Sequence, residues 1–138
     1  MSYLLDTNAV IAVLGNKPAQ VQVRLVQAVR AGGRIATSSI VLFELWYGVS
    51  RSRRRRENTE QLKTFLSGDV DLIGFDGADA QIAGELRAEL SASGTPIGPY
   101  DVLIAAQALR TNATLVTANT REFSRVRGLS WQDWANAN

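Results

Sequence analysis

Residues 98–119, GPYDVLIAAQALRTNATLVTAN, carry the pattern that decides the fold: a helix start, an apolar helix and a short apolar strand. Gly98 and Pro99 mark the helix start, because proline is tolerated in the first turn, where its missing N–H has no intrahelical partner. Asp101 then lies in the first turn of a helix that is otherwise apolar. The helix dipole stabilises a carboxylate there by about 0.3–1 kcal/mol, which alone would explain Asp101 without a function. Other acids in the chain favour a second explanation.

The rest of the chain also alternates short apolar strands with helices. Strands are predicted at 2–5, 34–37, 70–75, 113–119 and 129–131. Helices are predicted over 9–14, from 18 until Gly32-Gly33 stop the helix, from the caps Ser38 and Ser39 to 49, from the arginine-rich stretch to 67, over 78–91 and from 99 onward. This alternation predicts an α/β fold with a mainly parallel central sheet covered by helices on both faces. Because the 138 residues show no linker and no repeat, we expect a single domain over 1–138.

The composition restricts the chemistry that the chain can perform. Cysteine and histidine are both absent, which excludes disulfides, thiolate metal sites, cysteine nucleophiles and a histidine general base. Catalysis would therefore depend on carboxylates, hydroxyls, lysine or arginine, with a hard metal ion held by oxygen. No stretch approaches the roughly 20 apolar residues of a membrane span, and the N-terminus lacks the features of a secretory signal. We therefore expect a cytoplasmic protein that makes no contact with a membrane.

Several polar side chains are predicted to meet at one edge of the sheet. Asp6 follows the first strand, Glu44 lies on the helix after the second, and Asn119 follows the strand at 113–119. Ligands of open parallel sheets bind outside the carboxyl ends of the strands, and the helix of Asp101 leads into one of these strands. Two carboxylates about 4 Å apart repel by about 4 kcal/mol at an effective dielectric constant near 20. A cluster of three therefore favours a cation, and Mg²⁺ or Mn²⁺ suits oxygen ligands.

Three hydroxyl and amide side chains adjoin these acids: Thr7, Asn8 and Thr117. They either orient metal-bound waters or cap helices, and the sequence leaves both roles open. Four further acids are assigned outside the site, namely Asp76 and Asp79 as helix caps and Glu85 and Glu89 on a solvated face.

The stretch RSRRRR at 51–56 concentrates positive charge in a chain whose net charge is only +2. Such a stretch is typical of a solvated helix end. Arginine also pairs with phosphate oxygens, so a patch that contacts phosphate groups is the alternative. The arginines concerned are Arg51, Arg53, Arg54, Arg55 and Arg56.

Four ordered blocks of the sequence resemble the PIN-domain ribonucleases, and most closely the VapC toxins of type II toxin-antitoxin systems. The blocks are YLLDTNAVIAVL, TSSIVLFELWYGV, GTPIGPYDVLIAAQAL and LVTANTREFSRVRGLSWQDW, and together they span nearly the whole chain. The resemblance implies a three-layer α/β/α sandwich, Mg²⁺-dependent endoribonuclease activity, a homodimer and a cognate antitoxin. It also makes transfer RNA the leading substrate, with the anticodon stem-loop of initiator tRNA as the expected site.

By position in these blocks, Asp6, Glu44 and Asp101 match the acidic triad of the family. Many members carry a fourth acid where this chain has Asn119. An amide oxygen can bind a metal but brings no charge, so the resemblance leaves open whether one metal ion binds or two. Glu122 is close enough in sequence to replace the missing acid, although a surface position on a short helix is slightly favoured.

Other functions remain to be separated from an RNA-cleaving toxin. They include a nuclease of the same fold that acts on other RNA or on DNA, and a catalytically silent interaction protein suggested by Asn119. A receiver-type binding domain is disfavoured, because such domains need a lysine after their last strands and the only lysines here are Lys17 and Lys63. The segment 43–47, FELWY, suggests a further hypothesis, in which large apolar side chains beside Glu44 anchor an antitoxin in a groove. Packing in the core is the alternative role of these side chains.

Overall fold

The structure is a computed structural model that describes residues 1–136; residues 137 and 138, the end of the predicted polar tail, lie outside the described part. The strands within it are β1 (Ser2–Leu5), β2 (Arg34–Ser38), β3 (Val70–Ile73), β4 (Thr114–Val116) and β5 (Trp131–Gln132). The helices are α1 (Thr7–Gly15), α2 (Ala19–Arg30), α3 (Ser39–Arg51), α4 (Arg55–Ser67), α5 (Gly77–Ala92), α6 (Pro99–Thr111) and α7 (Thr120–Phe123). Among the described residues, no helix has the length and apolar character needed to cross a membrane.

The strands form one sheet in the order β3-β2-β1-β4-β5, and each of their pairings is parallel. The central strand β1 pairs with β2 on one side, where Leu5 lies opposite Thr37. On its other side β1 pairs with β4, where Leu5 lies opposite Val116. The predicted α/β fold is confirmed, and the described sheet is parallel throughout.

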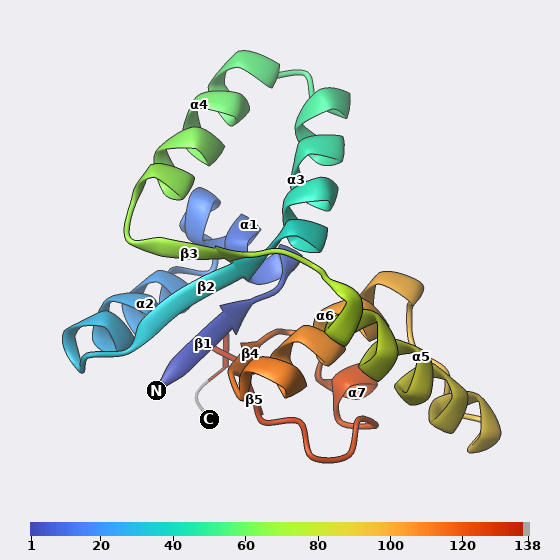
Figure 1. The fold of residues 1–138 in the computed structure, drawn as a ribbon. Coiled ribbons are helices and arrows are strands. Elements are labelled where there is room, and N and C mark those ends of the chain that lie inside the picture. The colour runs from blue at the N-terminus through green and yellow to red at the C-terminus, as the bar shows by residue number, and fades with distance from the viewer. Residues whose placement is uncertain (137–138) are drawn as a thin grey trace.

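The order of the strands explains the three layers seen in Figure 1. The chain builds β1, β2 and β3 in one direction and then returns past β1 to add β4 and β5. Because crossovers between parallel strands are right-handed, this reversal places α1 and α2 on one face and α5 and α6 on the other. Helices α3 and α4 form an arm that extends away from the body of the molecule. The reversal between β1 and β4 creates the type of crevice in which open α/β sheets bind ligands.

Side-chain caps fix where three of the helices begin. Asp6 caps α1 by accepting a hydrogen bond from the Ala9 amide at 2.9 Å, and Ser38 caps α3 through the Ile40 amide at 2.9 Å. Asp76 and Asp79 form a capping box at the start of α5, as the sequence predicts for these two acids. Each cap satisfies amide groups that have no partner within the helix.

Strand ends differ from the prediction by a few residues. The predicted strand 113–119 contains β4, which stops at Val116 because its partner β1 stops at Leu5. Likewise β3 ends at Ile73 rather than at residue 75, and β5 begins at Trp131 rather than at residue 129. The polar residues after β4 are therefore free of the sheet and available to the site.

The core lies between the central strands and the helices on each face. Leu4 and Leu5 of β1, Leu115 of β4 and Ile104 of α6 are almost completely inaccessible to solvent. Burial of a large apolar side chain stabilises the fold by about 1.5–3 kcal/mol. The strand ends next to Asp6 and Asn119 are thus packed against the hydrophobic core.

Candidate active site

Asp6 lies at the carboxyl end of the central strand and is only 5% exposed. Burial raises the pKa of its carboxyl group, because the charged form loses solvation, while hydrogen bonds from Thr117 and the Ala9 amide lower the pKa in part. The charges of Glu44 and Asp133 raise the pKa of Asp6 further. Its role as the cap of α1 therefore holds a buried carboxylate close to other acids.

Glu44 is joined to the N-terminus of α1 by a hydrogen bond. The Thr7 hydroxyl donates to Glu44 Oε1 at 2.7 Å and so links α1 to α3. Thr7 thus contacts an acid directly, which the sequence analysis did not anticipate. The two helices that follow β1 and β2 bring Asp6 and Glu44 within electrostatic range.

Asp101 is half-buried in the first turn of α6, on the opposite face of the sheet from α1. Burial raises the pKa of Asp101 to about 7, and a hydrogen bond shared with Glu122 and the charges of Glu122, Asp6 and Glu44 act in the same direction. The structure thus brings together the three acids that the sequence placed in one site. Repulsion among their charges, added to the loss of solvation, makes the ionised form of Asp101 unfavourable.

Asn119 and Glu122 complete this cluster of acids. The Asn119 side-chain amide donates to Asp101 Oδ2 at 3.3 Å and also to Glu122 Oε2. Glu122 Oε1 accepts from the Gly98 amide at 2.8 Å. These hydrogen bonds, led by that of Asn119, hold the pKa of Glu122 below its usual range. Glu122 therefore contacts the cluster, although it belongs to the short helix α7 and is only partly buried, so its part in the site stays a prediction.

Asp133 is a buried acid beside the cluster and is not among the predicted site residues. It follows β5 directly and accepts hydrogen bonds from the Ala135 amide at 2.9 Å and from the Asn136 side chain at 2.5 Å. The rule that acids gather after parallel strands, which identified Asp6, would have identified Asp133 as well. The contacts of Asp133 are local, so it caps the turn after β5.

The two remaining predicted support residues lie in different surroundings. Thr117 is buried, forms a hydrogen bond with Asp6 and accepts one from the Asn119 amide at 2.9 Å. Asn8 is exposed and lines a hollow of about 230 Å³ beside α1, together with Thr117 and Asp133. Thr117 orients a carboxylate, whereas Asn8 faces solvent at the edge of the cluster.

The donor chemistry of the cluster fits a hard divalent cation. The salt bridges found among residues 1–136 are Arg34–Asp71, Arg54–Glu57 and Arg110–Asp79, none of which includes a member of the cluster. As the side chains lie, no three acids in this part of the chain form a ready-made group for one metal ion. Their oxygen atoms are nevertheless the ligands that Mg²⁺ and Mn²⁺ prefer, and a cation would offset the repulsion that raises the pKa of Asp101.

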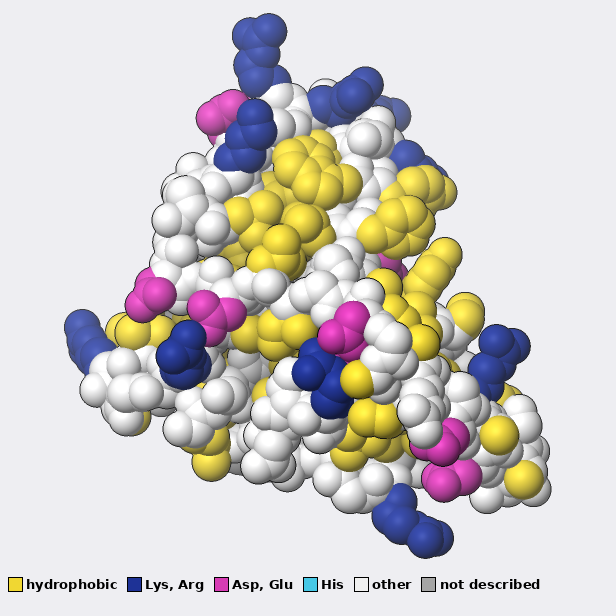
Figure 2. All heavy atoms as spheres, viewed as in Figure 1, with side chains coloured by type: hydrophobic (Ala, Val, Ile, Leu, Met, Phe, Trp, Pro, Cys, Tyr) yellow, Lys and Arg dark blue, Asp and Glu magenta, His cyan; other side chains and the backbone are white. Residues whose placement is uncertain are grey.

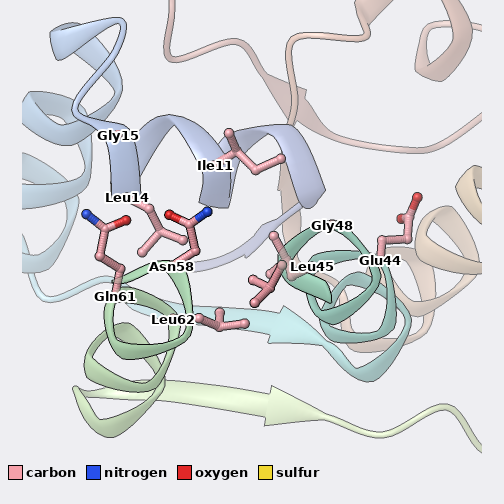
Figure 3. Close-up of a pocket in the computed structure, with 10 residues that line it drawn as sticks. Ile11, Leu14, Gly15, Glu44, Leu45, Gly48, Asn58, Gln61 and Leu62 are labelled. Carbon is pink, nitrogen blue, oxygen red and sulfur yellow. The ribbon is translucent and has the colours of Figure 1, made fainter. Parts of the chain in front are cut away.

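A groove borders the cluster where α1, α3 and α4 meet (Figure 3). It has a volume of about 370 Å³, and Leu14, Leu45 and Leu62 point into it. Glu44 lies at one end with its carboxylate directed away from the leucines. An apolar surface thus leads directly to one acid of the cluster.

The arginine-rich stretch forms the end of the α3–α4 arm. Arg51 is the last residue of α3, and Arg55 is the first of α4. Figure 2 shows basic side chains gathered at this end of the molecule. All five arginines are exposed, and Arg54 pairs with Glu57. The stretch is therefore a solvated helix junction, a position that leaves it accessible to a phosphate backbone.

The fold is that of a known class of protein. The PIN domain model matches residues 3–129, so the chain belongs to the PIN-domain family. Within that family its relatives are VapC proteins. The chain is 40% identical to the tRNA(fMet)-specific endonuclease VapC of Shigella flexneri over 137 residues, which cover 98% of this chain and 99% of that protein. It is 41% identical to ribonuclease VapC2 of Rickettsia felis over 134 residues, 97% of this chain and 98% of that protein.

Solved structures agree with these sequence relatives. A chain in the crystal structure of VapBC2 from Rickettsia felis bound to a promoter DNA fragment superposes with a TM-score of 0.90 at 40% identity, covering 97% of this chain and 99% of that one. A chain in the DNA-bound VapBC structure from Salmonella typhimurium gives a TM-score of 0.87 at 36% identity, covering 97% and 98%. The predicted resemblance to VapC toxins is confirmed.

Proposed function

We propose that this protein is a Mg²⁺-dependent endoribonuclease that cleaves transfer RNA and is inhibited by a cognate antitoxin. The observation that supports it most is the set of acids around Asp101. Burial and three nearby carboxylates raise the pKa of Asp101 to about 7, although no cation of the chain pairs with it among the described salt bridges. Such an arrangement costs folding free energy and is typical of catalytic sites.

Asp6 and Asp101, with Glu44, are the residues that would hold the metal ion. A bound divalent ion would polarise a phosphate oxygen and help to ionise a water molecule, which needs no histidine. Thr7 and Thr117 keep the carboxylates of Glu44 and Asp6 in place through their hydrogen bonds. Asn119 holds Asp101 and Glu122 together and is the fourth catalytic residue of the proposal. Mn²⁺ is expected to substitute for Mg²⁺.

Transfer RNA is the proposed substrate because relatives that match nearly the whole chain bear that specificity in their names. These are the tRNA(fMet)-specific endonucleases VapC of Shigella flexneri and of Salmonella typhimurium, at 40% and 37% identity. We propose the anticodon stem-loop of initiator tRNA as the cleaved site. The exposed arginines of the arm would contact its phosphates.

The antitoxin is proposed to lie in the groove between α1, α3 and α4. VapBC structures from three bacteria contain chains similar to this one. An apolar helix or extended segment suits Leu14, Leu45 and Leu62, and an arginine at its end would neutralise the acids beside Glu44. Of the FELWY segment, Leu45 lines this groove, whereas Phe43 and Tyr47 are exposed and are not among its lining residues. A homodimer, as the family resemblance implies, is part of the same proposal.

Cleavage of purified RNA is the test that separates this function from its alternatives. Initiator tRNA, an elongator tRNA and duplex DNA are incubated with the protein and Mg²⁺, and the products are sequenced. We expect one cut in initiator tRNA that disappears when a chelator is added. Cleavage of duplex DNA instead would indicate a DNA nuclease, and no cleavage of any substrate would favour a silent interaction protein.

Growth measurements test the toxin role separately. Expression of the protein alone is expected to arrest growth, and co-expression with the small open reading frame beside its gene is expected to restore it. Harmless expression of a wild-type protein that cleaves RNA in the purified assay would refute the toxin role and leave the nuclease assignment intact.

A further inference from the structure

Three aromatic side chains near the acids are exposed to solvent. Phe43 is 55%, Tyr47 58% and Tyr100 45% exposed. The rings of Phe43 and Tyr100 lie 5.7 Å apart, centroid to centroid, and are tilted by 58°. The Arg51 guanidinium lies over the Tyr47 ring, 5.2 Å from its centroid, and donates to the Tyr47 hydroxyl at 3.2 Å. We call Tyr100, Phe43, Tyr47 and Arg51 the aromatic stripe.

The aromatic stripe connects the acids to the arginines of the arm. Phe43 directly precedes Glu44, and Tyr100 directly precedes Asp101, so the ring pair begins beside the proposed site. Phe43, Tyr47 and Arg51 follow one another every four residues on one face of α3, over a rise of about 12 Å. The stripe ends where the arginine-rich stretch begins. Figure 2 shows hydrophobic side chains over α3 next to the basic end of the arm.

This exposure is informative because aromatic rings contribute most to stability when they are buried. Single exposed apolar side chains are normal on protein surfaces, but a row of aromatic rings on two packed helices is a mark of a binding surface. A row of rings that ends at guanidinium groups suits single-stranded nucleic acid, whose bases stack on aromatic faces and whose phosphates pair with arginine. Aromatic residues and arginine are also enriched at protein–protein interfaces, whereas acidic residues are depleted there. The observation that favours nucleic acid is that this stripe runs from the acids of the proposed site to the exposed arginines of the arm.

We propose that Phe43, Tyr47 and Tyr100 form a stacking platform for unpaired bases of the RNA next to the phosphate that is cleaved. This inference rests on the proposed ribonuclease function. Stacking accepts every base, so the platform contributes affinity and position rather than a sequence code. It also requires unpaired bases, which selects a loop over a duplex.

The experiment uses Phe43→Leu, Tyr100→Leu and the double variant, which keep apolar volume but remove the ring. Trp131→Leu is the matched control, because Trp131 is an exposed aromatic residue of β5 outside the stripe. Binding of an initiator-tRNA anticodon stem-loop is measured with a chelator present, and kcat and KM are measured with Mg²⁺. Each stripe variant is expected to weaken binding by about five- to fiftyfold, with the change in KM rather than in kcat.

Abasic substitutions in the RNA loop identify the contact directly. If Phe43 or Tyr100 stacks on a base, removal of that base weakens wild-type binding but adds little to the loss already caused by the variant. Stripe variants that bind RNA like the wild type, or a Trp131→Leu variant that loses as much, would overturn the platform. A change of oligomeric state in light scattering, with RNA affinity retained, would assign the stripe to a protein interface instead and also overturn it. A wild-type protein that neither binds nor cleaves RNA would refute the proposed function itself.

Discussion

Asn119 decides the charge balance of the proposed site. Its amide donates to Asp101 and to Glu122, so two carboxylates are held together without a cation. The hydrogen bond from Asn119 lowers the pKa of Glu122, while burial and the neighbouring charges raise that of Asp101 to about 7. Near neutral pH, Glu122 is therefore ionised and Asp101 is partly protonated in the metal-free protein.

Asp101→Asn tests the role of the residue that the surrounding acids affect most. The substitution should abolish cleavage, because it removes a proposed metal ligand, and should leave the fold intact. A purified variant that cleaves RNA at the wild-type rate in Mg²⁺ would show that Asp101 is not part of the catalytic centre.

The same variant also tests how the stability of the protein depends on pH. The pKa of Asp101 is 3.8 in the unfolded chain and about 7 in the fold, so the folded form keeps a proton that the unfolded form releases between these values. Stability of the metal-free wild type should therefore fall as the pH rises from about 4 to 7, by about 1–2 kcal/mol once solvent screening of this half-exposed group is allowed for. Asp101→Asn should remove this fall, and Asp69→Asn, at an exposed acid before β3, should not.

Asn119→Asp should lower the stability of the metal-free protein and raise its affinity for the metal ion. The change replaces an amide that donates to Asp101 and Glu122 by a third carboxylate, which repels both. We expect a lower melting temperature without metal and a larger increase on adding Mg²⁺ than in the wild type. Calorimetric melting across a Mg²⁺ titration measures both effects, and an identical Mg²⁺ response in the two proteins would place residue 119 outside the metal shell.

At the scale of the elements, a buried hydrogen-bond chain fixes α6 relative to the strand ends. Gln107 of α6 is fully buried, accepts from the Ser38 hydroxyl at the β2–α3 junction and donates to the Ile73 carbonyl of β3 at 3.3 Å. Ser38 also caps the helix that carries Glu44, and α6 carries Asp101. One amide thus links the two helices that deliver these acids to the site.

Gln107→Leu should destabilise the fold, since the buried Ser38 hydroxyl loses its acceptor and the part-buried Ile73 carbonyl loses its side-chain donor. We expect a loss of about 2–4 kcal/mol in the free energy of unfolding. Urea unfolding measures this loss, which should appear as a lower midpoint at an unchanged slope. Gln81→Leu is the control on the exposed face of α5, and equal stabilities of the two variants would contradict a structural role for the buried amide.

A second prediction at this scale concerns the arginines of the α3–α4 arm. Replacing Arg53, Arg55 and Arg56 with glutamine should weaken RNA binding and flatten its dependence on salt. Each lost phosphate contact lowers the log–log slope by about 0.7 for single-stranded RNA. The control replaces Arg30 and Arg87, exposed arginines of α2 and α5, and a wild-type slope in the arm variant would identify its arginines as solvated residues that do not touch RNA.

For the whole molecule, α3 separates two surfaces that meet at Glu44. Leu45 lines the groove proposed for the antitoxin, and Phe43 and Tyr47 belong to the stripe proposed for RNA. Because the acids adjoin both surfaces, a partner in the groove could reach the carboxylates of the proposed site without covering the stripe. Inhibition and RNA binding should therefore be separable by mutation.

Ile11→Asp tests this separation. Ile11 lines the groove and is 52% exposed, so the variant should fold and cleave RNA. A carboxylate in the apolar groove should weaken antitoxin binding by about tenfold or more, so that co-expression of the antitoxin no longer restores growth. Leu72→Asp, at an equally exposed apolar residue of the edge strand β3, is the control. Full protection of cells expressing Ile11→Asp would exclude this groove as the antitoxin site.

The sequence by itself predicted the alternation of strands and helices, the caps at Ser38, Asp76 and Asp79, and the association of Asp6, Glu44 and Asp101 with one edge of the sheet, but not the Asp6 cap of α1. These features depend on local signals, since hydrophobic periodicity, proline at a helix start and capping side chains act within a few residues. The tertiary structure alone decided that Glu122 joins the cluster, that Gln107 is a buried link and that Phe43 pairs with Tyr100. These contacts join segments far apart in the chain, and their geometry follows from how the helices pack over the strand ends, for which a single sequence carries no local signal.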